Sequence, residues 1–305
     1  MTRVRGRTTT RTLTRIVTPA LLRRLPLPPL DDAGDKESRG RILAVGGCVQ
    51  VPGAMLLAGV AALRAGAGKL QLATVRAAAL PLGLAVPEAL VVGLPTTAAG
   101  EIAGTRAVAP LRAHAESADA LLVGPGMTAD RAAHALLAGL VGRLRDDAVL
   151  VLDGAGVIAL RHDEGLLAPL GGRAVLTPHA GEMAALLDVD KRDVEADAPE
   201  VARVAAARFG ATVALKGAES WIADPDGALL HYRGGAVGLG TSGSGDTLAG
   251  IVAGLAARGA PATTAAAWGV WAHGAAGRIL ARRMAAVGYL ARELLAEVPA
   301  LVGRR

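Results

Sequence analysis

Short, uninterrupted apolar segments recur along the 305-residue chain, and each ends at a glycine, a proline or a charged residue. Continuous apolar runs of this length are typical of strands that are buried on both faces of a sheet. Three of them precede segments with a helical pattern. This alternation predicts an α/β fold, a doubly wound, mostly parallel sheet with helices on both faces. The predicted strands are 41–46, 70–75, 120–123, 148–152, 174–177 and 211–215, and the predicted helices are 53–65, 129–140 and 181–187.

One antiparallel hairpin is expected beside these parallel strands. Residues 221–230 hold two short apolar segments around Pro225-Asp226-Gly227, a sequence that favours a tight turn. No Pro/Ser-rich linker and no internal repeat separates parts of the chain. The sequence therefore predicts a single domain over residues 18–305.

The N-terminal segment, residues 1–17, differs from the rest of the chain in charge. It holds five arginines and no acidic residue, whereas the whole chain has a net charge of +6. Removing these five charges leaves +1 for the remainder, so the basic character belongs to a terminal arm. We expect this arm to be disordered. A contact with nucleic acid or an anionic membrane and a role as a transit peptide are the alternatives.

The composition excludes several other classes of protein. Three Trp, two Tyr and one Phe are too few for a platform of stacked aromatic rings that would bind nucleic acid. A single cysteine, Cys48, excludes an internal disulfide and a cysteine-based zinc site, and it favours a reducing compartment. The apolar runs are too short to span a membrane. We therefore predict a cytoplasmic protein that binds neither nucleic acid nor membranes.

The most distinctive segment is the glycine-rich sequence GLGTSGSGD at residues 238–246, which runs directly into a helical pattern. Small residues let backbone N–H groups approach an anion, and the N-terminus of the following helix adds partial positive charge. Asp246 is either the N-cap of that helix or a base beside a bound phosphate. Its place at a helix N-terminus favours the carboxylate form. No lysine follows the glycines, so the segment is not a P-loop.

The segment GTSGSGDTLAG at 240–250 resembles the signature of the ribokinase-like superfamily, in which a glycine-rich loop ends in a catalytic aspartate. Further blocks are similar to those of the ADP-dependent NAD(P)H-hydrate dehydratases in their stand-alone form. They follow the order of that family from about residue 18 to 296. These blocks are RILAVGG at 41–47, PGAMLLAG at 52–59, RAGAGK at 64–69, VGPGM at 123–127, LTPHAGEM at 176–183 and ALKGA at 214–218.

This resemblance implies a ribokinase-like fold and a repair reaction on damaged nicotinamide cofactors. The family removes the water that has added across the C5–C6 double bond of (6S)-NADHX or NADPHX. It uses ADP, or ATP in some members, to turn the hydroxyl into a phosphate leaving group, and with ADP it releases AMP and phosphate. The resemblance also implies Mg²⁺ as a cofactor and a homo-oligomer, by analogy a tetramer. The choices between ADP and ATP and between NADHX and NADPHX stay open.

The resemblance also assigns roles to individual residues. Asp246 would be the catalytic base that deprotonates the hydroxyl of the hydrate. Together with Asp246, residues Ala54, Gly126 and His179 would bind the hydrate. No set of direct metal ligands is implied. The nucleotide-binding positions would be Lys216, Gly217, Ala218, Glu219, Ser220, Gly243, Ser244 and Gly245.

Several of these residues also have a purely structural interpretation. Lys216 could be a surface lysine that caps the sheet, and His179 could be a solvated loop residue, with Glu182 capping the next helix. Asp153 ends a predicted strand and is followed by Gly154, so we interpret it as a turn residue rather than as a helper of a Mg²⁺–phosphate complex.

Two other functions are compatible with the same motifs. One is a kinase that phosphorylates the hydroxyl of a small heterocyclic alcohol, with Asp246 as the same base. The other is an inactive nucleotide-binding relative. The blocks at 52–59 and 176–183 favour the dehydratase, because they resemble that branch of the superfamily rather than sugar kinases.

Overall fold

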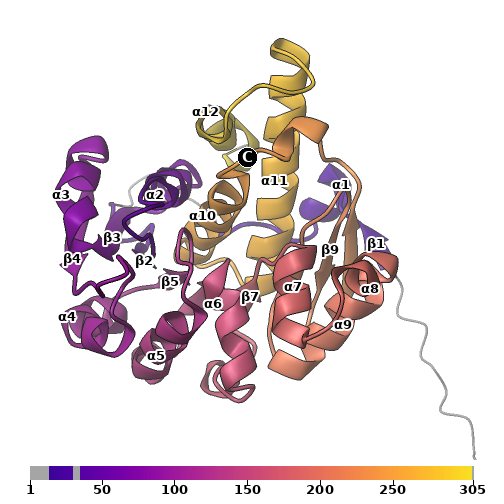
Figure 1. Ribbon diagram of the computed structural model, residues 1–305. Coiled ribbons are helices and arrows are strands. Elements are labelled where there is room, and N and C mark those ends of the chain that lie inside the picture. Colours follow the sequence, from indigo (N-terminus) through magenta and orange to yellow (C-terminus); the bar gives the residue numbers. More distant parts are fainter. Residues whose placement is uncertain (1–13, 30–34, 304–305) are drawn as a thin grey trace, which may run out of the picture.

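The computed structural model describes residues 14–29 and 35–303. Within these residues, ten strands form one sheet in the order β1-β10-β9-β8-β7-β6-β5-β2-β3-β4 (Figure 1). Of these strands only β9 runs against the others, so the sheet is mostly parallel, as predicted. The strands are β1 Thr14–Ile16, β2 Arg41–Val45, β3 Lys69–Val75, β4 Ala89–Leu94, β5 Ala120–Val123, β6 Val149–Leu152, β7 Ala174–Leu176, β8 Thr212–Leu215, β9 Ser220–Ala223 and β10 Leu229–Tyr232.

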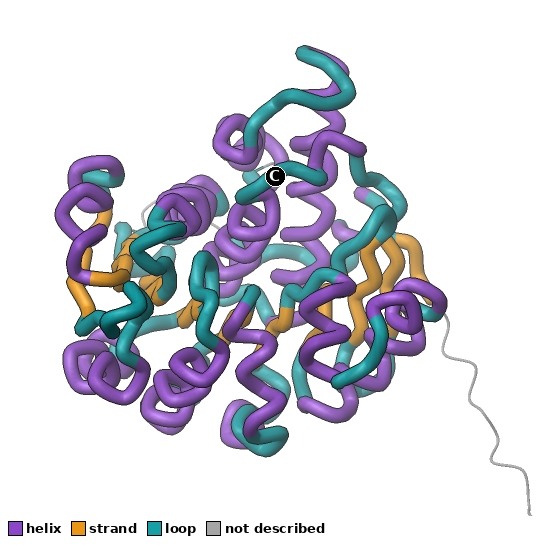
Figure 2. The backbone as a smooth tube through the Cα atoms, in the orientation of Figure 1, coloured by secondary structure: helices purple, strands orange, loops and turns teal. Residues whose placement is uncertain are grey.

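Helices cover both faces of the sheet, which confirms the predicted doubly wound architecture (Figure 2). Apolar side chains of the two helix layers form a separate core with each face of the sheet. The first layer consists of α1 Pro19–Leu22, α2 Gly53–Arg64, α10 Ser244–Ala257, α11 Ala262–Arg283 and α12 Ala291–Val302, with α3 Arg76–Ala85 at the edge beside β4. The second layer consists of α4 Gly104–Glu116, α5 Asp130–Leu140, α6 Ala155–Ile158, α7 Ala180–Leu187, α8 Lys191–Ala196 and α9 Ala198–Phe209.

The N-terminal edge of the sheet differs from the prediction of a disordered arm over 1–17. Residues 14–16 form β1, which pairs in parallel with β10, and the Val17 N–H donates to the His231 carbonyl at 2.8 Å. Val17 is buried in the core of the first layer. The last residues of the predicted arm therefore belong to the sheet, because an extended edge segment gains backbone hydrogen bonds whatever its charge. Residues 1–13 lie outside the described residues. Among the described helices, none is both long and apolar enough to cross a bilayer.

The helix that follows the glycine-rich segment packs closely against α2. Gly250 of α10 lies against the backbone of Ala58 of α2, and a Cβ at Gly250 would lie 2.8 Å from the Ala58 carbonyl carbon. Gly254, one turn later, has the same relation to the backbone of Ala62. These small residues let α10 lie deep in the first layer, and this contact fixes where its N-terminus meets the sheet edge.

We expect Gly250→Ala to lower the free energy of unfolding by about 1–3 kcal/mol, because the added methyl group forces α10 away from α2. Urea denaturation of the two proteins measures this difference. Gly142→Ala is the matched control, since a Cβ at Gly142 meets no atom within 4 Å. Equal effects of the two substitutions would contradict the proposed role of the α2–α10 contact.

Candidate active site

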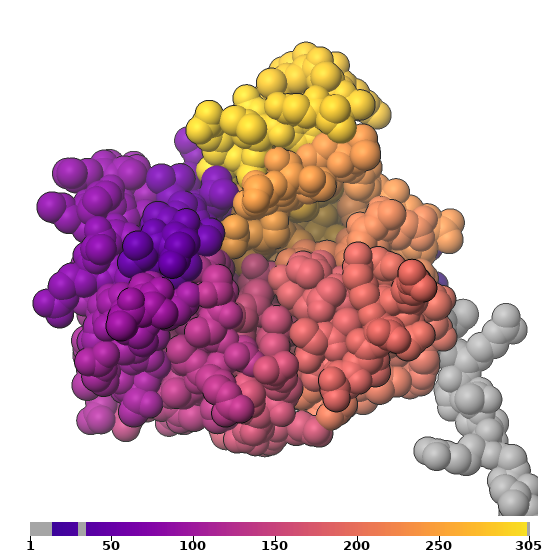
Figure 3. Space-filling model, in the orientation of Figure 1, coloured from indigo at the N-terminus to yellow at the C-terminus, as the bar shows by residue number. Residues whose placement is uncertain are grey.

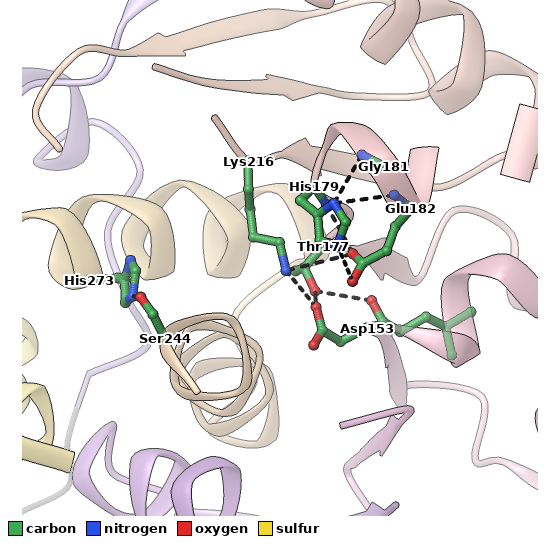
Figure 4. A network of polar contacts seen from close by, with 9 residues as sticks. Asp153, Thr177, His179, Gly181, Glu182, Lys216, Ser244 and His273 are labelled. Carbon is green, nitrogen blue, oxygen red and sulfur yellow. Dashed lines mark hydrogen bonds and ion pairs between the residues drawn. The ribbon is translucent and has the colours of Figure 1, made fainter. Parts of the chain in front are cut away.

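Three polar side chains gather at the carboxyl edge of the sheet, where strands β6, β7 and β8 end in adjacent positions. Asp153 follows β6, Thr177 follows β7 and Lys216 follows β8 (Figure 4). The three strands are parallel neighbours, so their carboxyl ends bring these side chains together. Ligands of open α/β sheets bind at this edge.

A lysine network occupies this edge, and it consists of Asp153, Thr177, Glu182 and Lys216. Lys216 Nζ donates to Asp153 Oδ1 at 2.8 Å and lies 3.9 Å from Glu182 Oε2. The Thr177 hydroxyl donates to the same Asp153 oxygen at 2.8 Å. Asp153 is only 5% exposed. The interpretation of Asp153 as a mere turn residue is therefore wrong, since its buried carboxylate holds the lysine in place.

Lys216 is not the surface cap that the sequence left open as an alternative. Its side chain is 17% exposed, and it lies between carboxylates. Burial alone would lower the pKa of Lys216, but the carboxylates of Asp153 and Glu182 outweigh it and raise the pKa above the usual lysine range. The structure thus holds a permanent positive charge at the sheet edge.

His179 begins α7 and is joined to Glu182 in a reciprocal cap. The His179 Nδ1 atom accepts hydrogen bonds from the Gly181 and Glu182 N–H groups, while Glu182 Oε2 accepts from the His179 N–H at 2.9 Å. The predicted capping role of Glu182 is confirmed. Burial favours protonation of Glu182, but its hydrogen bond with His179 and the charge of Lys216 lower its pKa. Glu182 therefore contributes a negative charge beside Lys216.

The glycine-rich segment folds into a loop that opens α10, as predicted. Gly243 is the N-cap and has a φ of +85°, and a Cβ at this position would collide with Leu57. Only glycine adopts this conformation readily. Asp246 lies in the first turn of α10, and no side chain caps this helix. The alternative that Asp246 serves as the N-cap is therefore wrong.

The charge state of Asp246 differs from the sequence prediction, which favoured the carboxylate form. Burial, together with the negative charges of Asp153 and Glu182, raises the pKa of Asp246 to about 7, and Lys216 only partly opposes this shift. The helix N-terminus does not outweigh these effects. Asp246 is thus a group that exchanges a proton near neutral pH, which is typical of functional sites.

A cavity of about 710 Å³ opens beside Lys216 and the N-terminus of α10. In Figure 3 the surface is hollowed between the orange and yellow C-terminal segments and the salmon segment below them. The predicted residues His179, Lys216, Gly217, Ala218, Ser220, Ser244 and Gly245 line this cavity. The other lining residues are Tyr232, Gly235, Ala236, Val237, Leu239, Gly240, Thr241, Leu248, Val270, His273 and Gly274. Gly245 lies so near the lysine that a Cβ there would be 3.1 Å from Lys216 Nζ.

Glu219 is the one member of the predicted 216–220 stretch that does not line the larger cavity. Its side chain faces an adjoining cavity of about 520 Å³, which Trp221 and Lys191 also line. Glu219 Oε2 lies 2.6 Å from His231 Nε2, and the His231 ring stacks on Trp221 with centroids 3.7 Å apart. The buried His231 therefore holds the Glu219 side chain at the rim of the larger cavity rather than within it.

Three predicted hydrate-binding residues, Ala54, Gly126 and Asp246, are not among the lining residues of either cavity, and Ala54 and Gly126 lie together. Gly126 has a φ of +67°, and a Cβ at this position would lie 2.7 Å from the Ala54 Cβ atom. Ala54 is buried at the start of α2. The structure therefore separates the predicted residues: one group lines the cavity around Lys216, and another lies at the contact between the 124–126 turn and α2.

Thr177 was not predicted as a partner in the lysine network, and His273 was assigned no role. His273 lines the large cavity from α11 and lies 2.9 Å from the hydroxyl of Ser244. The position of Asp153 at the end of a predicted strand could have indicated its place in the lysine network. In the described part of the chain, no three or more His, Cys, Asp or Glu side chains form a group that could hold a metal ion.

The fold and the site define a ribokinase-like α/β protein with a glycine-rich loop at the carboxyl edge of its sheet. A ribokinase-like superfamily protein from Enterococcus faecalis superposes with a TM-score of 0.80 at 26% identity, covering 95% of each chain. An ADP/ATP-dependent NAD(P)H-hydrate dehydratase from Bacillus subtilis, co-crystallised with ATP and Mg²⁺, has a TM-score of 0.77 at 24% identity, covering 96% of this chain and 98% of that one.

Sequence comparison identifies the branch. The family model of NAD(P)H-hydrate dehydratase matches residues 42–300. The ADP-dependent (S)-NAD(P)H-hydrate dehydratase of Xanthomonas campestris is 54% identical over 95% of this chain and 96% of its own length. The chain belongs to the NAD(P)H-hydrate dehydratase family, as its motifs predicted. It spans only about half, 52%, of the bifunctional NAD(P)H-hydrate repair enzyme of Moorella thermoacetica, to which it is 39% identical over 90% of its length.

Proposed function

We propose that this chain catalyses the ADP-dependent dehydration of (6S)-NADHX and NADPHX, which yields NADH or NADPH together with AMP and phosphate. The observation that carries the proposal is the position of Asp246, a carboxyl group with a pKa of about 7 in the first turn of α10, beside a cavity that holds the buried charge of Lys216. The 54% identical relative from Xanthomonas campestris, which is named as ADP-dependent, supports the same reaction.

Asp246 is the proposed base of the first step. Its carboxylate accepts the proton of the hydrate hydroxyl as the hydroxyl oxygen bonds to the terminal phosphorus of ADP, and the bond from that phosphorus to AMP breaks. In the second step the C6–O bond breaks and phosphate leaves, while C5 loses a proton and the C5–C6 double bond forms again. A base with a pKa near the working pH combines a useful ionised fraction with sufficient basicity.

The large cavity is the proposed nucleotide site. Its volume of about 710 Å³ lies within the usual range for small-molecule sites, about 300–1,000 Å³. Lys216 supplies positive charge, and the free N–H groups at the N-terminus of α10 face the same space. We assign the diphosphate of ADP to the region between Lys216 and Gly245, and the rest of the nucleotide to the cavity along the 217–220 segment. Gly243 gives the glycine-rich loop its conformation, and Glu219 lies at the rim of the proposed nucleotide site.

We assign the hydrate to Asp246, His179, Ala54 and Gly126. The His179 side chain is 57% exposed and so accessible to a ligand, although its Nδ1 atom caps α7 and its Nε2 atom lies 2.9 Å from Glu182 Oε1. Ala54 and Gly126 have no bulky side chain, and so the backbone of each permits a close approach. This assignment is the part of the proposal that follows from the family motif rather than from the cavity.

Mg²⁺ is compatible with this site as an ion that binds with the nucleotide. Magnesium keeps several waters and uses one or two carboxylates together with phosphate oxygens, so a dedicated protein cage is unnecessary. Asp153 is the buried carboxylate beside Lys216 that would stabilise it. Bound there, the ion would neutralise charge on the phosphates. We further propose a cytoplasmic homo-oligomer, a tetramer by analogy with the family.

The direct test offers the purified protein (6S)-NADHX with ADP, with ATP or with no nucleotide. We expect the dihydronicotinamide absorbance to return with a nucleotide, with one AMP and one phosphate formed per NADH when ADP is used. Accumulation of a phosphorylated hydrate without this absorbance would instead show a kinase. Nucleotide binding without either product would show an inactive relative. Parallel reactions with NADPHX in place of NADHX, and with ATP in place of ADP, show which hydrate and which nucleotide are preferred.

A further inference from the structure

A serine–histidine pair lies in the large cavity, apart from the lysine network. Ser244 is the first residue of α10, and its Oγ atom lies 2.9 Å from Nε2 of His273, in the middle of α11 (Figure 4). Both residues line the cavity, although Ser244 is only 5% exposed. The side chain that opens the anion-binding helix is thus held by a residue of a different helix, 29 positions further along the chain.

The rest of the contact between α10 and α11 is apolar. Leu248, Val252 and Val270 belong to the core of this layer, and Gly269 lets the two helices approach closely at Val252. Packing of the two helices therefore does not need a polar pair. The pair occurs only where the two helices open to the cavity, which indicates a role toward a ligand.

We propose that His273 is a positioning residue for the nucleotide: its Nε2–H group donates to Ser244 Oγ and so directs the hydroxyl proton of Ser244 toward a phosphate oxygen of ADP. This inference rests on the proposed function, because it places the ADP phosphates at the N-terminus of α10. A serine hydroxyl has one proton and two lone pairs. When His273 occupies a lone pair, the proton remains free for the phosphate.

The protonation state of His273 agrees with this arrangement. Burial, assisted by the positive charge of Lys216, lowers the pKa of His273 to about 4. The imidazole is therefore neutral near pH 7, and only one of its nitrogens carries a proton. A neutral donor adds direction to the phosphate contact without repelling Lys216. Lys216 thus supplies charge, whereas His273 and Ser244 supply orientation.

The test compares ADP binding by calorimetry, and KM for ADP, in wild type, Ser244→Ala, His273→Leu and the double variant. We expect each single substitution to raise the Kd for ADP about tenfold, the usual effect of losing a hydrogen bond to a charged group. The double variant should be no weaker than Ser244→Ala, because both changes remove one shared contact. The change should appear in KM for ADP more than in kcat.

His273→Gln is the conservative variant, since its amide N–H group can still donate to Ser244. It should recover most of the ADP affinity that His273→Leu loses. Thr263→Val is the matched control on α11, because it removes a hydroxyl contact of the same length, 2.9 Å to Thr212 Oγ1, at the other end of the helix. Thr263→Val should bind ADP as wild type does.

Three results would overturn the inference: a folded His273→Leu with wild-type ADP affinity, equal losses in His273→Leu and His273→Gln, or additive losses in the double variant. Equal losses would mean that the histidine acts only through packing. A wild-type protein that binds ADP but does not turn over the hydrate would refute the proposed reaction and leave the binding comparison valid. A wild-type protein that does not bind ADP would refute both.

Discussion

Asp246→Asn is expected to reduce kcat for the dehydration by about 10²–10⁴-fold, the range in which a positioned general base contributes. The amide keeps the shape of the carboxyl group but cannot accept the proton of the hydrate hydroxyl. Because α10 and its glycine-rich loop do not depend on Asp246 as a cap, ADP affinity should be retained. Absorbance recovery and ADP calorimetry measure the two effects. Asp193→Asn is the control, since it removes an exposed carboxylate from the first turn of α8.

The pH dependence of the wild type gives a second readout of the same group. Since the pKa of Asp246 is raised to about 7, the base is mostly protonated below pH 7 and mostly ionised above it. The rate should therefore increase with pH through about 7 and then level off. The residual activity of Asp246→Asn should lack this rise. A wild-type rate that does not change across neutral pH would contradict the assignment of Asp246 as the base.

Asp246→Asn should also stabilise the fold above neutral pH. Asp246 binds its proton more tightly in the native state, where its pKa is about 7, than in the unfolded chain, where it is near the ordinary value of 3.8. The ionised group therefore opposes folding fully above pH 7, and this opposition fades as the pH falls from about 7 to 4. We expect Asp246→Asn to gain about 1–3 kcal/mol above pH 7 and nothing at pH 4. Loss of activity with a gain of stability would separate catalysis from folding.

The centre of the sheet could be predicted from the sequence because its strands are buried on both faces. Residues 120–123 and 149–152, for example, are apolar throughout and have parallel neighbours on each side. The edges could not be predicted in this way. In β4 most residues are partly exposed, and α3 before it contains Pro81, so neither has a clear pattern. β1 is exposed throughout and is defined by its pairing with β10.

The candidate site was predictable where one segment carries the chemistry and less so where several segments meet. The glycine-rich loop and Asp246 are contiguous, so their sequence predicts an anion-binding helix start. The raised pKa of Asp246 depends instead on its burial in the fold and on the charges of Asp153, which follows β6, and Glu182, which lies in α7. The contact of Ser244 with His273 likewise depends on how α11 lies against α10. A sequence pattern predicts which residues reach the sheet edge, but their charges act on one another only after folding.

Lys216→Met is expected to lower the free energy of unfolding by about 3–5 kcal/mol, because it leaves the buried carboxylate of Asp153 without its partner. Asp153 Oδ1 would keep the Thr177 hydroxyl but lose the ammonium group at 2.8 Å. Lys191→Met is the matched control. Lys191 pairs with Glu195 at 3.2 Å, but both side chains are more than half exposed, and such a pair contributes at most about 1 kcal/mol. Urea denaturation at one pH compares the two variants.

The stability of Lys216→Met does not by itself reveal what the lysine does for the reaction. The double variant Asp153→Asn/Lys216→Met separates the role of Lys216 in stability from its role in ADP binding and turnover. Removing both charges leaves no buried carboxylate without a partner at this position, so most of the lost stability should return. ADP affinity and turnover should not return, because the positive charge beside Gly245 is still absent. Asp153 raises the pKa of Asp246 and Lys216 lowers it, so the two substitutions shift the protonation of the base in opposite directions. A double variant that regained both stability and wild-type turnover would show that Lys216 only balances Asp153.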